Sequence, residues 1–293
     1  MLQLDNISKA FGGRTALDGV TFGVRDGRMT GFVGGNGAGK TTTMRILLGV
    51  LEGDAGEIYL DGEPLGAQQR RHFGYMPEER GLYPKMKVRE QLVYLARLHG
   101  YSSADAGRSA DSLVEELGLG ERRNSTLESL SLGNQQRAQI AAALVHDPQI
   151  LVLDEPFSGL DPLAVDTVVE VLKQRAAAGA SVLFSSHQLE IVERLCDDLV
   201  IIADGSIRAS GERESLKAEH SAPRYTIASS ADLGWLRAEP DITVVEFDSG
   251  HATFDASEPA AAQRVLRRAV TDGNVSTFAP QRASLAQIFR EVI

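Results

Sequence analysis

The sequence predicts an α/β chain with a largely parallel core sheet, a helical insert and a small α+β domain at the C-terminal end. Short, continuously apolar runs of the kind found in fully buried parallel strands flank a helical pattern in the second half of the chain. A stretch of amphipathic helical periodicity interrupts this alternation. Beyond about residue 220, strands and helices follow one another in a new order.

The first 60 residues alternate apolar runs with glycine-rich turns, which indicates strands joined by tight turns. One helix is expected at 41–50, where Met44, Leu47 and Leu48 recur at helical spacing. From about residue 88 to residue 145 the apolar residues recur at helical spacing, and the last helix of this segment is expected at 135–145. The expected strands of this whole region are 2–7, 16–24, 29–33 and 57–60.

A second α/β stretch follows, in which a helix at 162–178 separates two buried strands, 150–153 and 181–185. A further strand at 199–203 turns at Asp204 and Gly205 into 206–210. After 220 the pattern predicts the order β-α-β-β-α-β-α, with the first helix at 231–237, which is close to a ferredoxin-like module. We therefore expect two domains, residues 1–221 and residues 222–293.

Composition excludes several classes of protein. The chain has 293 residues, of which 43% are hydrophobic and 24% charged, so it is neither collagen-like nor disordered. Its one cysteine, Cys196, excludes an internal disulfide framework and is expected to pack on the apolar side of a helix. The net charge of -10 disfavours a broad nucleic-acid surface. Neither an apolar run of about 18 residues nor a secretory signal is present, which predicts an intracellular chain able to dock on a membrane protein.

The sharpest motif is G-x-x-x-x-G-K-[ST], placed between an expected strand and an expected helix. Such a loop points backbone N–H groups at phosphates, and the helix N-terminus adds partial positive charge. Lys40 would reach the β- and γ-phosphates of a nucleotide, and the Thr41 hydroxyl would ligate Mg²⁺. The competing interpretation is a glycine-rich turn with an incidental lysine. The predicted phosphate-binding residues are Gly34, Gly35, Asn36, Gly37, Ala38, Gly39, Lys40, Thr41 and Thr42.

A second motif points to an ATPase. The apolar strand 150–153 ends in Asp154 and Glu155, and ligands of open α/β sheets bind at the carboxyl ends of the strands. Asp154 can hold Mg²⁺ through water, and Glu155 can polarise the attacking water. An acidic turn before Pro156 is the competing interpretation. The guanine-reading N-K-x-D sequence is absent, which counts against a GTPase.

Further motifs resemble those of ATP-binding-cassette (ABC) ATPases, in the family's order and over residues 1 to about 215. The segment 130–137 (LSLGNQQR) resembles the signature motif, 157–162 (FSGLDP) the D-loop and 185–187 (SSH) the switch histidine. Phe11, in the segment KAFG, matches the aromatic residue that stacks on adenine. The resemblance implies a P-loop fold with an antiparallel β-subdomain and a helical insert.

The resemblance also implies roles for individual residues. Two cassettes would pack head to tail, so that Ser131, Gly133 and Asn134 contact the ATP held by the partner subunit. His187 would hydrogen-bond the γ-phosphate and hold the attacking water in line with Glu155, although a lone histidine there could simply begin the next helix. The other five histidines show no ligand spacing and are expected to be structural or surface residues: His72, His99, His146, His220 and His251.

This sequence departs from the family pattern at three places. Leu132 and Asn134 replace the usual glycine and glutamine of the signature. The Q-loop glutamine, a Mg²⁺ ligand that couples to the membrane partner, falls at Glu78, with Glu79 as an alternative. Gly35 stands where proline is common, which should only loosen the turn.

The stretch 78–86 and the tail from 283 resemble ATPases of two-component exporters, which serve a separate permease chain and carry a small C-terminal domain. This implies a homodimer on the cytoplasmic face of the membrane, with ATP and Mg²⁺ as cofactors and no nucleic-acid partner. Tyr83, Pro84 and Met86 are expected to line a groove for the permease. The alternatives are a soluble ABC ATPase acting on ribosomes or DNA and, less specifically, a plain P-loop kinase.

Overall fold

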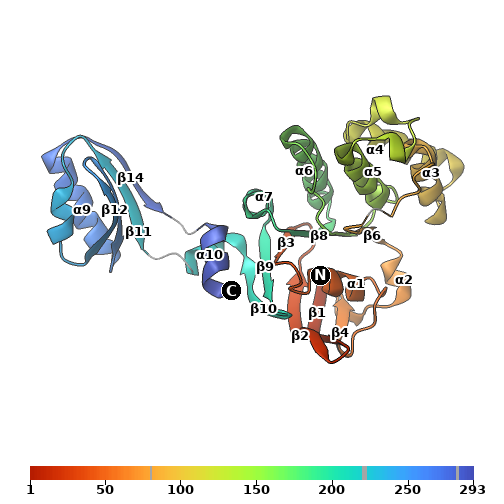
Figure 1. The fold of residues 1–293 in the computed structure, drawn as a ribbon, viewed down its shortest axis with the longest axis horizontal. Coiled ribbons are helices and arrows are strands. Elements are labelled where there is room, and N and C mark those ends of the chain that lie inside the picture. Colours follow the sequence, from red (N-terminus) through yellow and green to blue (C-terminus); the bar gives the residue numbers. More distant parts are fainter. Residues whose placement is uncertain (80, 220–222, 282–283) are drawn as a thin grey trace. The chain divides into compact units, whose positions relative to one another are not determined.

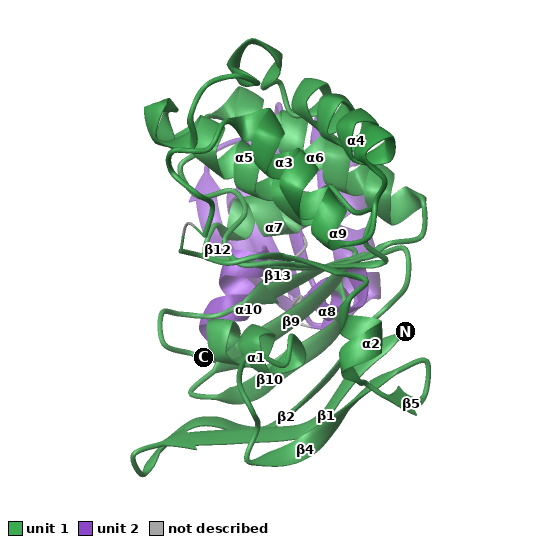
Figure 2. Ribbon diagram, turned by 90° about the vertical axis from the view of Figure 1, so that its right-hand side faces the viewer, with its two compact units in different colours: residues 1–213, 293 green, residues 214–292 purple. Residues whose placement is uncertain are grey.

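The computed structural model describes residues 1–79, 81–219, 223–281 and 284–293, which Figure 1 shows as a ribbon. Contacts divide the chain into unit 1 (Met1–Arg213, together with Ile293) and unit 2 (Glu214–Val292), which are coloured separately in Figure 2. The boundary expected at 221 falls on residues outside those described.

Unit 1 contains an antiparallel sheet of four strands in the order β2-β1-β4-β5. Its first two strands form a hairpin that turns at Gly12 and Gly13, both with positive φ. Alternate side chains of β1, such as Leu2 and Leu4, are fully buried, as expected for a sheet with one face on the core. The strands are β1 (Leu2–Phe11), β2 (Arg14–Val24), β4 (Ala55–Leu60) and β5 (Glu63–Pro64).

A second sheet of six strands, in the order β10-β9-β3-β8-β7-β6, forms the centre of unit 1. All its neighbouring pairs are parallel except β9 with β10. Four of its strands are buried at every position, as expected for a parallel sheet that is covered on both faces. The strands are β3 (Met29–Val33), β6 (Phe73–Met76), β7 (Ile150–Leu153), β8 (Ser181–Ser186), β9 (Asp198–Ala203) and β10 (Ser206–Glu212).

Helices cover the central sheet of unit 1 on both sides. In Figure 1, α5 and α6 lie on one side of the sheet and α1 lies on the other. Helix α5 begins three residues earlier than the sequence predicted, because the Ser131 hydroxyl caps it by accepting from the Asn134 N–H. The helices are α1 (Lys40–Leu47), α2 (Ala67–Arg70), α3 (Val88–Leu98), α4 (Ser103–Glu116), α5 (Leu132–Leu144), α6 (Pro162–Ala177) and α7 (Leu189–Leu195), with 3₁₀ turns at Gly120–Arg122 and Leu127–Ser129.

Unit 2 is an antiparallel sheet of four strands in the order β12-β13-β11-β14, with an apolar core that includes Ile227, Phe254 and Val265. The helix predicted at 231–237 is instead a 3₁₀ helix at Gly234–Ala238, because the Asp232 carboxylate accepts from the Gly234 N–H and fixes a turn at this point. The remaining elements are α8 (Arg213–Glu219), β11 (Arg224–Ser229), β12 (Ile242–Asp248), β13 (His251–Ala256), α9 (Pro259–Asp272), β14 (Val275–Gln281) and α10 (Leu285–Val292).

Candidate functional site: a phosphate-binding loop and two strand-end carboxylates

The glycine-rich loop joins the end of β3 to the start of α1, at the carboxyl edge of the central sheet. Gly39 has a φ of +113°, and a Cβ built on it would lie 2.5 Å from Leu17 Cδ2. A Cβ on Gly34 would lie 2.4 Å from the carbonyl oxygen of Ile202. Both positions therefore require glycine, because a side chain would collide with packed neighbours.

The two residues after the last glycine direct their polar atoms into the loop and toward β7. Lys40 is only 8% exposed, and its Nζ donates to the carbonyl oxygens of Gly34 and Gly35 at 2.7 and 3.1 Å. Thr41 Oγ1 donates to Asp154 Oδ2 at 2.7 Å. The amino group and the hydroxyl thus lie at the N-terminus of α1, where a phosphate group would be favoured.

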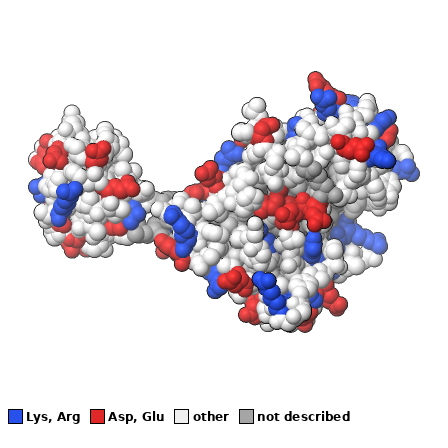
Figure 3. Space-filling view, viewed as in Figure 1, with Lys and Arg blue, Asp and Glu red and all other residues white. Residues whose placement is uncertain are grey.

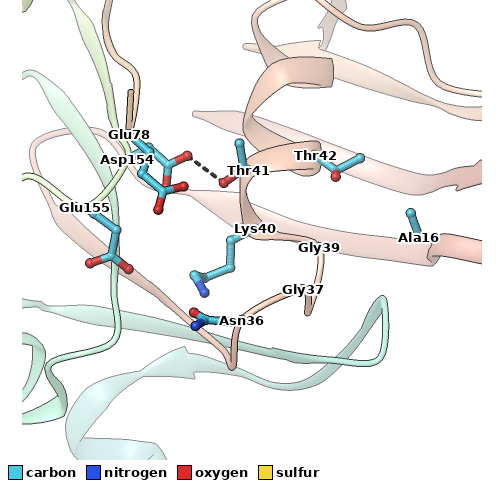
Figure 4. A pocket seen from close by; sticks show the side chains of 10 residues that line it. All are labelled: Ala16, Asn36, Gly37, Gly39, Lys40, Thr41, Thr42, Glu78, Asp154 and Glu155. Atoms are coloured by element: carbon cyan, nitrogen blue, oxygen red, sulfur yellow. Dashed lines mark hydrogen bonds between the residues drawn. The ribbon is translucent and has the colours of Figure 1, made fainter. Parts of the chain in front are cut away.

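A cavity of about 240 Å³ lies between this loop and the end of β7. In Figure 4 the carboxylates of Glu78, Asp154 and Glu155 gather near Lys40 and Thr41. Of the two Q-loop candidates, Glu78 lines the cavity and Glu79 does not. Ala16 also lines it, which the sequence did not predict. The lining residues are Ala16, Asn36, Gly37, Gly39, Lys40, Thr41, Thr42, Glu78, Asp154 and Glu155.

Glu155 is held in an unusual backbone conformation at the end of β7. Its φ is +52°, a left-handed value that few residues other than glycine adopt and that often marks functional sites. Its side chain is 12% exposed, and Oε2 lies 2.9 Å from Nδ1 of His187. The structure therefore brings together the predicted general base and the predicted switch histidine, which come from two adjacent parallel strands.

The signature residues lie elsewhere in unit 1. Ser131 is the N-cap of α5, and Leu132 beside it is 59% exposed. Ser131, Gly133 and Asn134 do not line the cavity that holds Lys40. The N-terminus of α5 is instead exposed to solvent.

Phe11 ends β1 with its side chain 49% exposed, so that a ring face is accessible. Lys9 Nζ lies 5.6 Å from the centre of this ring and is itself fixed by Asp54 Oδ1 at 2.7 Å. The remaining predicted loop residues are placed by backbone contacts, since the Ala38 N–H donates to the Gly35 carbonyl at 3.2 Å.

Three buried polar side chains hold the site together in roles that the sequence analysis did not assign. The Ser185 hydroxyl, on β8, bonds to Asp154 and to the backbone of Glu155. On α5, Gln136 Nε2 donates to the carbonyl oxygens of Glu155 and Pro156. Gln139 Nε2 donates to the carbonyl oxygens of residues 77 and 79, next to Glu78. A polar residue recurring at helical spacing among alanines was the available signal for the two glutamines.

Among the described residues, the other histidines and the cysteine form no group of three or more that could hold a metal ion. His99 and His146 stack with ring centres 3.6 Å apart, and burial lowers the pKa of His146 to about 4. Cys196 follows α7 as its C-cap rather than lying within it, and burial raises the pKa of its thiol to about 12. His220 lies outside the described residues. The packing of His99, His146 and Cys196 therefore indicates a structural role for these three side chains.

The groove expected at Tyr83, Pro84 and Met86 is arranged differently. A cavity of about 280 Å³ lies between α3, α5 and the segment after β6, but it is lined by Leu82 and not by those three residues. Tyr83 is 57% exposed and contacts the ring of Tyr94 edge-on, with centres 6.3 Å apart.

Comparison with known proteins finds similarity over the whole chain. Residues 17–158 match the family described as ABC transporter, and residues 211–293 match the family described as ATP-binding protein DrrA1-3-like, C-terminal domain. The uncharacterized ABC transporter ATP-binding protein YhaQ of Bacillus subtilis is 38% identical over 100% of this chain and 98% of its own length.

Two further similarities cover about three quarters of the chain. Nod factor export ATP-binding protein I of Paraburkholderia xenovorans is 38% identical over 73% of this chain and 72% of its own. Among solved structures, the ATP binding subunit of an ABC transporter is 34% identical, with a TM-score of 0.69 over 75% of this chain and 92% of that one.

Proposed function

The chain belongs to the ATP-binding proteins of ABC transporters, and on this premise we propose that it drives an exporter whose permease is a separate chain. As a member of this family it binds ATP and hydrolyses it to power transport. The exporter assignment is supported by the DrrA1-3-like match at the C-terminal end and by the similarity to a Nod factor export protein.

One observation carries the proposal for the site. Side chains from the glycine-rich loop, from the segment after β6 and from the end of β7 line a single cavity at the N-terminus of α1. Backbone N–H groups, the Lys40 ammonium and the helix dipole all favour a polyphosphate there. We place the triphosphate of ATP along residues 34–42, with Lys40 at the β- and γ-phosphates and the adenine on Phe11.

The donors in this cavity suit Mg²⁺. Thr41 Oγ1 and Asp154 Oδ2 lie 2.7 Å apart, and Glu78 lines the same cavity, which gives a set of oxygen atoms only. In the described part of the chain, no group of His, Cys, Asp and Glu residues could hold a metal ion by itself. We place the ion jointly on Thr41, Asp154, Glu78 and the phosphates of ATP. When bound, Mg²⁺ would neutralise charge on those phosphates.

Glu155 and His187 are arranged to activate water. The Glu155 carboxylate ends a strand at the cavity and can accept a proton from a water molecule that attacks the γ-phosphate. His187, within hydrogen-bond distance of that carboxylate, would hold the water in line and contact the γ-phosphate. Positioning of this kind supplies much of the catalysis in phosphoryl transfer.

A second copy of the chain would complete the nucleotide site. Ser131, Gly133 and Asn134 lie at an exposed helix N-terminus away from the cavity of their own subunit. A head-to-tail homodimer would bring them to the γ-phosphate held by the partner. ADP would not close the dimer, because it lacks the bridging phosphate, and loss of this bridge after hydrolysis would shift the population toward the open state.

We place the permease contact at the 280 Å³ cavity beside the helical insert. Apolar side chains from β6, α3 and the segment after β6, including Phe73, Leu95 and Leu82, line it. An amphipathic helix of a permease could lay its apolar face into such a groove. Because Gln139 donates to backbone on both sides of Glu78, movement of this groove would reach the nucleotide site.

Location and partners follow from the same proposal. No helix in the described ranges is long and apolar enough to span a membrane. We propose that binding to the permease places the chain at the cytoplasmic face. On the face drawn in Figure 3, Lys and Arg lie scattered among Asp and Glu, and the net charge is -10, which supports the absence of a nucleic-acid partner. We assign residues 1–221 to the ATPase domain and residues 222–293 to a ferredoxin-like accessory domain.

Replacing the general base tests the chemistry. Glu155→Gln should retain ATP binding and hydrolyse ATP at least about 10²-fold more slowly, because the proton acceptor is lost. Steady-state release of phosphate and equilibrium binding of ATP measure the two effects. Glu170→Gln, an exposed position on α6, is the matched control and should behave as wild type. Hydrolysis by Glu155→Gln at the wild-type rate would remove Glu155 from this role.

A pull-down tests the transport assignment. Tagged Glu155→Gln protein is incubated with ATP and detergent-solubilised membranes of the source cells, and bound proteins are identified by mass spectrometry. We expect a polytopic membrane protein in near-stoichiometric amount and an ATP-dependent dimer. Recovery of ribosomal or DNA-bound partners without a membrane protein would favour a soluble ABC ATPase instead.

A further inference from the structure

Ser185 is hydrogen-bonded to both of the acidic residues that follow β7, to the carboxylate of Asp154 and to the backbone of Glu155. It is the fifth residue of β8 and is 0% exposed. Its Oγ donates to Asp154 Oδ1 at 2.6 Å and accepts from the Glu155 N–H at 2.8 Å. A serine hydroxyl has one proton to donate, so these two bonds give each partner a defined role: Asp154 accepts and Glu155 donates.

The first bond restricts the Asp154 carboxylate. Oδ1 is held by Ser185, while Oδ2 accepts from Thr41 Oγ1 at 2.7 Å. A carboxylate bonded through both oxygens cannot rotate about its terminal bond without breaking one of these contacts. Ser185 therefore keeps Oδ2 directed toward the phosphate-binding loop.

The second bond restricts the backbone of Glu155. This residue has a φ of +52°, a conformation that costs free energy for a residue with a Cβ and persists only where its surroundings enforce it. Ser185 holds its N–H, and Gln136 Nε2 holds its carbonyl oxygen at 2.9 Å. The peptide groups on both sides of the Glu155 Cα are thus fixed, which sets the direction in which its side chain leaves the strand.

We propose that Ser185 is a positioning residue for ATP hydrolysis, setting the orientation of Asp154 and Glu155 together from the neighbouring strand. The inference rests on the proposed roles of those two carboxylates. Removal of the hydroxyl leaves the buried Glu155 N–H and Asp154 Oδ1 without this hydrogen-bond partner. Because an unsatisfied buried polar group is unfavourable, we expect both groups to shift toward other partners. A displacement of about 1 Å at reacting groups can cost about 10²-fold in rate.

The test compares two serines of the same strand. Ser181, the first residue of β8, is 2% exposed, and its hydroxyl donates to Asp26 at 3.1 Å. Four residues of strand separate the two serines by about 13 Å. Ser181→Ala therefore removes a similar buried hydroxyl, bonded to a carboxylate, far from the phosphates. Ser185→Thr keeps the hydroxyl and serves as the rescue variant.

We expect Ser185→Ala to lower kcat by roughly 10- to 100-fold while the Kd for ATP changes less than about threefold, since the loss falls on the transition state. Ser185→Thr should recover most of kcat, and Ser181→Ala should keep the wild-type kcat. Unfolding midpoints are measured for all three. A wild-type kcat for Ser185→Ala, or an equal loss in Ser181→Ala, would overturn the inference.

Glu155→Gln, assayed in parallel, separates this inference from the proposed function. A slow Glu155→Gln variant beside a fully active Ser185→Ala variant would refute the role of Ser185 alone. Normal hydrolysis by Glu155→Gln would refute the proposed chemistry, and the Ser185 inference with it.

Discussion

Unit 1 buries polar side chains in its interior, whereas the described residues of unit 2 bury only apolar ones. In unit 2 the charged pairs, such as Arg224 with Asp255, stay partly exposed. In unit 1 several buried polar groups lie at the ends of β7 and β8 or on the helix that packs near them. The buried polar residues are Thr30, Lys40, Thr43, Gln91, Gln136, Gln139, Asp154, Ser181, Ser185, Ser186 and Asp198.

The buried polar groups of unit 1 can be related to its proposed nucleotide site. A buried polar group is unfavourable unless it is hydrogen-bonded, so a cluster of such groups is expected where function requires it. Lys40, Asp154 and Ser185 meet this description, because each has its bonding partners within the site. The buried side chains that form the apolar core of unit 2, as far as the structure describes it, contribute to packing. Substitutions in the two units should therefore fail in different ways.

The largest effect is expected from Lys40→Ala. In the proposed site the Lys40 ammonium makes charge-assisted bonds to two phosphates, and their loss should raise the Kd for ATP at least about 10²-fold and abolish hydrolysis. Isothermal titration calorimetry measures the affinity. Arg267→Ala, which removes an exposed cation from α9 of unit 2, is the control and should bind ATP as wild type does. Equal weakening by both variants would contradict the division of roles.

A large effect on stability, without an effect on nucleotide binding, is expected in unit 2. Phe254 is fully buried and stacks on Tyr225 with ring centres 5.8 Å apart. Phe254→Ala should lower the free energy of unfolding of unit 2 by about 3–5 kcal/mol through loss of packing and a residual cavity. Urea unfolding of the full chain measures the change, and the Kd for ATP should stay as in wild type.

Val270→Ala is the matched control, because Val270 is 60% exposed on α9 and its truncation should change stability by less than about 0.5 kcal/mol. Loss of ATP affinity in Phe254→Ala under conditions where unit 1 remains folded would show that the two units are coupled.

The smallest effect concerns the Arg224–Asp255 pair. The bond from Arg224 lowers the pKa of Asp255, and the two side chains are 29% and 30% exposed. Because the pKa of Asp255 is lowered by folding, its ionised carboxylate stabilises the folded state at pH values above the ordinary pKa of about 3.9. This stabilisation is lost as the pH falls through the lower pKa of the folded state. Asp255→Asn should therefore lower the free energy of unfolding by about 0.5–1 kcal/mol at pH 7, and by progressively less below about pH 4.

A double-mutant cycle with Arg224→Met at pH 7 isolates the pair. A coupling energy near zero, or a deficit in Asp255→Asn that grows as the solution is acidified, would show that the pair does not stabilise unit 2.

Much of unit 1 could be predicted because its signals are local. Residues 34–42 are contiguous, and the glycines among them stand where the loop backbone adopts conformations that favour glycine, so the sequence alone reveals the loop. Continuously apolar strands and the α/β alternation predicted a largely parallel core sheet, which the structure confirms. Two differences from the predicted elements arise from local hydrogen bonds. A serine cap extends α5 to Leu132, and Asp232 produces a 3₁₀ turn where a helix was expected.

The sequence by itself determined the family, the glycine-rich loop and the strand that ends in two carboxylates, because each depends on neighbours along the chain. Only the tertiary structure decided that β8 lies beside β7, which brings Ser185 to Asp154 across 31 residues of sequence. It likewise placed Glu78 rather than Glu79 in the cavity. A hydroxyl or amide bonds to whatever lies within about 3 Å, and strand order and register, not sequence distance, fix that partner.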